Sequence, residues 1–191
     1  MSKAASASAS SSPEGGLVGT LGVVVLAVCL GFGFAFLPRL FRGASSGMVG
    51  KPGPDFSLDV VANSLAPANA KKLGLAELRG HPVILDFWAT WCGPCQAQSP
   101  ILDGVAHRYA DRGVVVVGID TNDAPGSAAR WASAHGITYP ILFDAEQDAA
   151  RQYGVESLPT IVVLNREGKV HAVRVGFTDQ GEIEGLLRQV L

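Results

Sequence analysis

Two cysteines three positions apart, Cys92 and Cys95, follow an apolar run in the stretch DFWATWCGPCQ at 86–96. A Cys-x-x-Cys pair can bind a metal, form a structural disulfide or exchange thiols with other disulfides. A structural zinc site needs four ligands, yet no second pair is present, and His81 and His107 have no recognised ligand spacing. A disulfide that closes so short a loop stabilises a fold little. The pattern therefore favours redox chemistry, and we expect no metal.

The residues around the pair favour a reactive thiolate at Cys92. VILDFW at 83–88 has the length and apolar character of a buried strand, and Gly93 and Pro94 are suited to begin a helix directly after it. A helix N-terminus stabilises an anion and can lower a thiol pKa from about 8.5 to about 7. We therefore expect Cys92 to attack a substrate disulfide and Cys95 to release the product by attacking Cys92.

Strand and helix patterns alternate through the rest of the chain. Such alternation is typical of an α/β domain with a mixed central sheet flanked by helices. A hairpin near the C-terminus, with the turn NREG, makes part of that sheet antiparallel. The predicted strands are 83–88, 114–120, 139–143, 160–164 and 169–175, and the predicted helices are 92–109, 126–135, 145–153 and 179–191.

An uncharged segment, LVGTLGVVVLAVCLGFGFAFL, occupies residues 17–37. As a helix it would span about 30 Å, the thickness of a bilayer's hydrocarbon core. The apolar part of a cleaved signal peptide is shorter, about 7–15 residues, so we expect an uncleaved transmembrane anchor in which Cys29 is inert. Residues 1–16 are too poor in large apolar residues to fold, 38–54 are predicted to be a flexible tether, and the globular domain is expected at 55–191.

Composition excludes some function classes and assigns structural roles to other residues. The net charge is −2 and no basic face is evident, so nucleic acid is not an expected partner. We interpret Trp88 as a core residue and His135 and His171 as surface residues. The acidic stretch DTND at 120–123 lacks the full calcium-loop pattern and is predicted to be a solvated turn.

The quoted motif resembles the thioredoxin active site, including Pro100 after the second cysteine. Together with VGKPGPDFSL, SLPT and NREGKV, it is similar to the TlpA/ResA type of membrane-anchored thioredoxin-like disulfide reductases over residues 49–191. The resemblance implies a thioredoxin-like fold preceded by one N-terminal transmembrane helix, and no cofactor.

The resemblance also implies roles for individual residues. Asp86 would take a proton from the resolving thiol Cys95, because a carboxylate in an apolar setting has a pKa near neutrality. Pro159 would be a cis-proline facing the cysteines. Many proteins of this type carry a glutamate where this chain has Gln98, which cannot titrate, so Asp86 would act alone. The residues expected to contact substrate are Trp91, Gly93, Pro94, Leu158 and Pro159.

These inferences predict a membrane-anchored thiol-disulfide oxidoreductase that reduces protein disulfides, with cytochrome c maturation as one implied setting. Its expected partners are protein disulfide substrates, an upstream membrane thiol donor and the lipid bilayer through residues 17–37. Arg39 and Arg42, against Lys3, favour a cytoplasmic domain by about one charge. The resemblance implies the extracytoplasmic, periplasmic side, which we expect.

Two alternatives from other classes stay open. A peroxiredoxin-like peroxidase would share the fold, although its Pro-x-x-x-Thr-x-x-Cys signature does not occur in this chain. A non-catalytic tethered binding module or copper carrier would need a downstream histidine ligand, and none is convincingly placed.

Overall fold

The computed structural model describes residues 47–63 and 71–191. The predicted tail, the predicted transmembrane segment and the first part of the predicted tether lie outside these ranges. Within them, no helix has both the length and the apolar character needed to cross a membrane.

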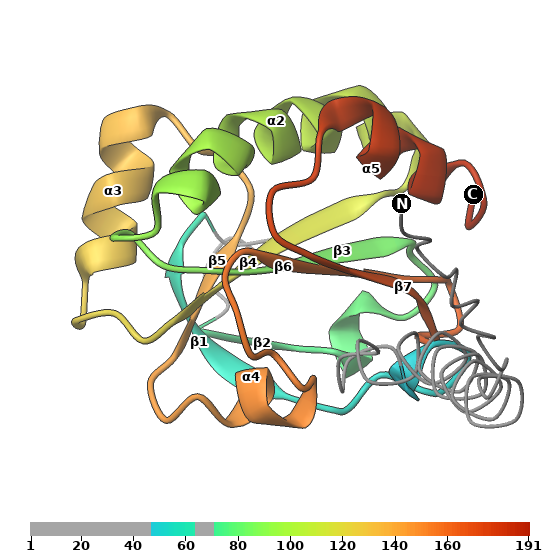
Figure 1. Ribbon diagram of the computed structural model, residues 1–191, viewed down its shortest axis with the longest axis horizontal. Coiled ribbons are helices and arrows are strands. Elements are labelled where there is room, and N and C mark those ends of the chain that lie inside the picture. The colour runs from blue at the N-terminus through green and yellow to red at the C-terminus, as the bar shows by residue number, and fades with distance from the viewer. Residues whose placement is uncertain (1–46, 64–70) are drawn as a thin grey trace, which may run out of the picture. The chain divides into compact units, whose positions relative to one another are not determined.

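One seven-stranded mixed sheet forms the centre of the domain, in the order β2-β1-β5-β4-β3-β6-β7 (Figure 1). The three central strands, β5, β4 and β3, are parallel to one another, and the remaining pairs are antiparallel. The predicted α/β fold with a mixed sheet is therefore confirmed. The strands are β1 (Ser57–Ala62), β2 (Lys72–Gly74), β3 (Val83–Trp88), β4 (Val115–Thr121), β5 (Ile141–Asp144), β6 (Thr160–Leu164) and β7 (Val170–Val175).

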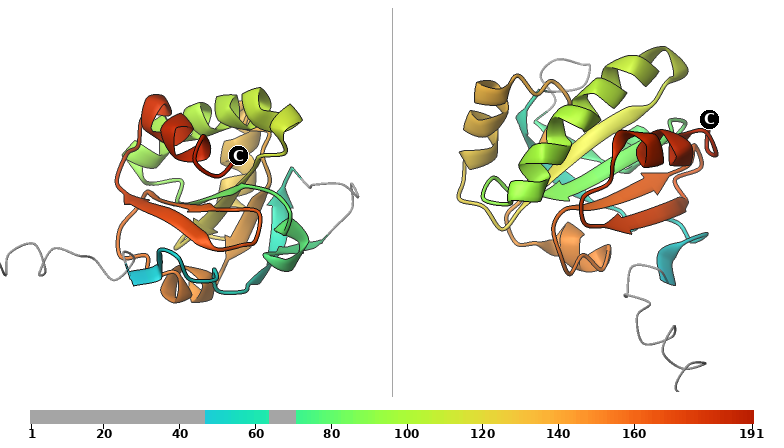
Figure 2. Two further views of the ribbon diagram at one scale, coloured as in Figure 1. Left: turned by 90° about the vertical axis from the view of Figure 1, so that its right-hand side faces the viewer. Right: turned by 45° about the horizontal axis from the view of Figure 1, so that its top comes forward.

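Helices cover both faces of the sheet (Figures 1 and 2). Three of them, α2, α3 and α5, lie on one face and contribute to one apolar core cluster, whereas α4 lies on the other face and contributes to a second cluster. The helices are α2 (Gly93–Tyr109), α3 (Ser127–His135), α4 (Asp148–Gln152) and α5 (Gln180–Leu187), with short 3₁₀ turns η2 (Ala76–Leu78) and η3 (Ala110–Arg112).

Strand β3 is buried along its whole length because it lies between β4 and β6 with helices on both faces. Successive side chains point to opposite faces. Ile84 and Trp88 belong to the core cluster beneath α2, while Leu85 and Phe87 belong to the cluster on the α4 face. Asp86 therefore lies on the α2 face, between two apolar residues.

Most predicted elements agree with the structure to within a few residues. The exceptions are β1 and β2, which were not predicted, and α5, which ends at Leu187 rather than at Leu191. Strand β1 was not predicted because its side chains are only half-buried or exposed, so its sequence lacks the continuous apolar run of a buried strand. Asp179 caps the N-terminus of α5, because its Oδ1 accepts a hydrogen bond from the Glu182 amide at 3.0 Å.

The folded domain begins earlier than the predicted boundary at residue 55. The amide of Gly50 donates to the carbonyl of Val170, and the amide of Gly53 donates to that of Gly168. Pro52 also forms an antiparallel bridge with Lys169. The end of the predicted tether is therefore bound along the start of β7, and the prediction that it is a flexible linker is wrong for these residues.

Candidate active site

The two predicted cysteines lie where β3 ends and α2 begins, and they form a disulfide. The Sγ atoms are 1.98 Å apart, and Sγ of Cys92 accepts a hydrogen bond from the Cys95 amide at 3.3 Å, so Cys92 caps the helix. Cys92 is 6% exposed, whereas Cys95 is completely buried. Gly93 and Pro94 form the exposed first turn of α2. Cys95 is therefore closed to an approaching molecule, and Cys92 is the less buried of the two cysteines.

A buried carboxyl group lies on the sheet face beneath this helix. Asp86 is inaccessible to solvent, and its Oδ1 accepts a hydrogen bond from Nε2 of Gln98 at 3.1 Å. Its Oδ2 has no partner among the residues that the structure describes. Burial raises the pKa of Asp86 to about 7, and the hydrogen bond from Gln98 lowers it in part. The group can thus hold or release a proton near neutral pH.

Gln98 connects this carboxyl group to the segment before α5. Its Oε1 accepts a hydrogen bond from the Thr178 amide at 2.8 Å while its Nε2 donates to Asp86. Sequence reasoning noted only that Gln98 cannot titrate and missed this bridge. The signal was its spacing, because residues three and seven positions after Cys95, Gln98 and Leu102, share the buried face of α2.

The predicted cis-proline is confirmed, since the Leu158–Pro159 peptide bond is cis. Thr160 pairs with Phe87 across the sheet, so Pro159 lies level with the end of β3, just before the loop that leads to Cys92. The carbonyl of Pro159 accepts a hydrogen bond from the Gly176 amide at 2.8 Å.

The acidic stretch 120–123 was predicted to be a solvated turn, and this prediction is wrong for Asp120 and Thr121, which are buried at the end of β4. Both carboxylate oxygens of Asp123 accept hydrogen bonds from Thr90: Oδ2 from its amide at 2.6 Å and Oδ1 from its hydroxyl at 2.9 Å. The indole Nε1 of Trp91 donates to the carbonyl of Asn122 at 3.0 Å. The loop after β4 therefore anchors the two residues that directly precede Cys92.

A second buried carboxyl group begins this stretch. Asp120 is 1% exposed, and neither of its carboxyl oxygens has a partner in the described part of the chain. Burial raises the pKa of Asp120 to about 8, and the charge of Asp123 contributes to this rise. Sequence reasoning missed this residue because an aspartate at a strand end is usually solvated. Its position directly after the apolar run VVVVGI was the available signal, and the structure pairs it with Trp88 of β3.

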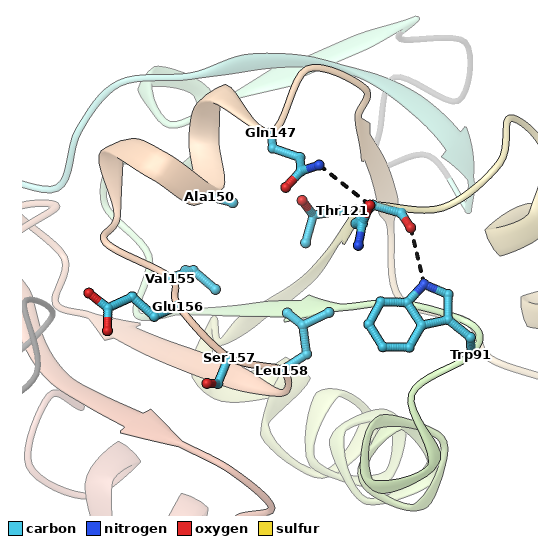
Figure 3. A pocket seen from close by; sticks show the side chains of 9 residues that line it. Trp91, Thr121, Gln147, Ala150, Val155, Glu156, Ser157 and Leu158 are labelled. Carbon is cyan, nitrogen blue, oxygen red and sulfur yellow. Dashed lines mark hydrogen bonds between the residues drawn. The ribbon is translucent and has the colours of Figure 1, made fainter.

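A groove of about 190 Å³ opens against Trp91, the residue that precedes Cys92 (Figure 3). Trp91, with 60% of its surface exposed, forms one wall, and Leu158 forms another. Both were predicted to contact substrate, and that role stays a prediction. The other lining residues are Thr121, Asn122, Gln147, Ala150, Val155, Glu156 and Ser157.

Comparisons with known proteins agree with this geometry. A sequence model of the AhpC/TSA family matches residues 49–173. The chain is similar to the thiol-disulfide oxidoreductase ResA of Bacillus anthracis, with 28% identity over 88% of this chain and 94% of the relative. ResA of Bacillus subtilis (strain 168) is 26% identical over 88% of this chain and 90% of its own length. A crystal structure described as a putative thiol:disulfide interchange protein DsbE, from Chlorobium tepidum, superposes with a TM-score of 0.67, 29% identity, and coverage of 74% of this chain and 96% of that one.

Proposed function

The chain belongs to the AhpC/TSA family, and we propose that it acts there as a membrane-anchored reductant of protein disulfides. It is a thiol-disulfide oxidoreductase of thioredoxin-like fold, similar to proteins named ResA and DsbE. The observation that carries the proposal is the pair itself. Cys92 lies at the start of a helix with 6% of its surface exposed, and Cys95 is completely buried one turn away in the same disulfide.

The reduced protein starts the reaction with Cys92 as a thiolate, stabilised by the first turn of α2. Its sulfur bonds to one sulfur of the substrate disulfide, the substrate S–S bond breaks, and the other substrate sulfur leaves as a thiolate that takes a proton from water. Cys95 then loses its proton and bonds to Cys92, which displaces the second substrate thiolate. Two electrons pass to the substrate, and the protein is left with the Cys92–Cys95 disulfide.

Asp86 is the proposed acceptor of the Cys95 proton. The buried Cys95 thiol cannot give its proton directly to bulk water, and the Asp86 carboxyl group lies on the sheet face that α2 covers. Because its pKa is about 7, it is partly ionised at neutral pH and can return the proton later. Gln98 is a positioning residue, since it fixes one carboxyl oxygen and leaves the other free of partners among the described residues.

Membrane attachment through residues 17–37 is supported by the uncharged length of that segment. The resemblance to membrane-anchored reductases supports an extracytoplasmic domain, an upstream membrane thiol donor and substrates such as the cysteines of apocytochrome c. Labelling of Cys92 in intact cells by a membrane-impermeant thiol reagent tests the side of the membrane. Labelling only after the cells are opened would place the domain in the cytoplasm.

Reduction of insulin by the full-length chain in detergent, driven by dithiothreitol, tests the activity. We expect turnover by the native protein, none by Cys92→Ser, and a trapped mixed disulfide with Cys95→Ser. A midpoint potential above about −150 mV would identify an oxidant instead. Peroxide turnover that is lost in Cys92→Ser but retained in Cys95→Ser would establish the peroxidase alternative.

A further inference from the structure

The groove against Trp91 has one apolar side and one polar side. Ala150, Val155 and Leu158 supply apolar surface, and the ring of Trp91 closes one end (Figure 3). The Trp91 ring is held in place by the hydrogen bond from its Nε1 to the carbonyl of Asn122, so its exposed face is a fixed wall. Such a surface suits the methylene stem of a long side chain.

The polar side offers oxygen atoms. Thr121 is 4% exposed, and its Oγ1 has no hydrogen-bond partner in the described residues, although the side chain lines the groove. Gln147 also lines it, and its Nε2 donates to Oδ1 of Asn122 at 3.5 Å, which leaves the Gln147 Oε1 as an acceptor (Figure 3). The Gln147 Oε1 is therefore the side-chain acceptor that this side offers to an entering donor-rich group, and the Thr121 Oγ1 lies buried in the groove wall.

The segments that form the groove carry an excess of acidic residues. Asp123 follows Asn122, Glu146 and Asp148 flank Gln147, and Glu156 lines the groove with its carboxylate turned outward (Figure 3). The one basic residue of these segments, Arg151, is paired with Asp148 and donates to the Glu146 carbonyl. The local potential is therefore negative, and it attracts a cation.

We propose that this groove is a subsite for a lysine or arginine side chain that lies close in sequence to the substrate cysteine attacked by Cys92. The stem would pack on Val155 and Leu158, and the cationic group would lie over the Trp91 ring and donate to the Gln147 Oε1. This inference rests on the proposed function and names a substrate class for it: disulfides in basic segments.

Matched peptide substrates test the subsite. The full-length protein in detergent is supplied with fluorogenic disulfide peptides that differ only at one position two residues from the cysteine, which holds lysine, arginine, glutamine or glutamate. We expect kcat/KM for lysine and arginine to exceed that for glutamine about fivefold, with glutamate lowest. The preference should shrink in high salt, because the charges near the groove are partly exposed.

Two variants test whether the preference for basic peptides arises in this groove. Glu156→Lys and Gln147→Lys should each lower the lysine-to-glutamine ratio of kcat/KM at least about threefold. The matched control is Glu167→Lys, which makes the same charge change as Glu156→Lys at an exposed position in the β6–β7 turn, at the far end of β6 from Pro159. Glu167→Lys should keep the ratio of the native protein.

The outcomes separate the two proposals. Equal kcat/KM for all four peptides would overturn the subsite and leave the reductase function standing. Reduction of none of them would overturn the reductase function, and the subsite with it. A ratio that falls equally in Glu156→Lys and Glu167→Lys would show a general charge effect and overturn the placement in this groove. If a groove variant fails to fold, the native protein's peptide ratios and their salt dependence still decide.

Discussion

Nε2 of Gln98 donates a hydrogen bond to Oδ1 of Asp86 at 3.1 Å, so a neutral amide holds one oxygen of a fully buried carboxyl group. The chain thus places a residue that cannot titrate next to one whose pKa is about 7. The two residues can be tested separately, because Gln98 holds the Asp86 carboxyl group and lowers its pKa in part without exchanging protons itself.

Replacing Gln98 by glutamate should move the pH profile of disulfide reduction upward. Two carboxyl groups in one buried site resist joint ionisation, so the pair keeps a proton to higher pH. A smaller fraction of Asp86 is then ionised at pH 7 and able to accept the Cys95 proton. We expect the acidic limb of the kcat/KM profile to rise by about one pH unit or more, with a lower rate at pH 7. The matched control, Gln189→Glu at an exposed position after α5, should leave the profile in place. An unchanged limb in Gln98→Glu would show that Asp86 is not the proton acceptor.

The buried Asp86 carboxyl group should make the protein less stable as the pH rises. Its pKa is about 7 in the folded protein, against an ordinary value of 3.8, so the unfolded chain binds fewer protons between these two pH values. The free energy of unfolding should therefore fall as the pH rises from about 4 to about 7, by up to about 4 kcal/mol for this group. Asp120, with a pKa of about 8, adds in the same direction.

Asp86→Asn should be more stable than the native protein at pH 8 and closer to it at pH 4.5. Urea denaturation of the oxidised proteins at both pH values measures the difference. The same variant should reduce insulin about 100-fold more slowly at pH 7, because the proton acceptor is lost. If the difference in the free energy of unfolding between Asp86→Asn and the native protein were the same at both pH values, the assigned pKa would be contradicted.

The anchor between Asp123 and Thr90 should be needed for the geometry of the cysteine loop. Asp123→Ala removes both acceptors of the Thr90 amide and hydroxyl, and leaves the part-buried amide without a partner. We expect a loss of about 1–3 kcal/mol in the free energy of unfolding, together with slower attack by Cys92. Thr90→Val removes only the hydroxyl bond and should show a smaller effect on both. If Thr90→Val matched Asp123→Ala, the amide bond would be unimportant.

Two glycine-to-alanine substitutions should change stability in opposite directions. A Cβ at Gly118 in β4 would lie 3.0 Å from Nε1 of Trp88 and 3.0 Å from Cε2 of Tyr139. Overpacking of this kind costs about 1–3 kcal/mol. A Cβ at Gly104 in α2 would meet nothing within 4 Å, so Gly104→Ala should stabilise the helix by about 0.5–1 kcal/mol. Thermal denaturation of the two variants provides the comparison.

Much of the fold could be predicted because its central strands are short apolar runs bounded by glycine or proline. The buried strand β3 and the helix after it were predicted nearly residue by residue, and they position Cys92, Cys95 and Asp86. The half-buried β1 could not be predicted in this way, because a strand with one covered face and few large apolar residues resembles a loop.

The supporting contacts of the site were harder to predict, because they join segments far apart in sequence. Thr90 and Asp123 are 33 positions apart, and Gln98 and Thr178 are 80 positions apart. Their residue types are ordinary for loops and helices, and only the strand order brings them together. The two cysteines, in contrast, could be predicted because they belong to one short contiguous motif.

The unequal burial of the two sulfurs has a kinetic consequence. Because only Cys92 reaches the surface, the molecule that supplies electrons and the molecule that receives them must use the same entrance, one after the other. The two partners therefore exclude each other, and turnover follows a ping-pong pattern. An excess of either partner should slow the enzyme, because that partner occupies the entrance while the cysteine pair is in the redox form that cannot react with it.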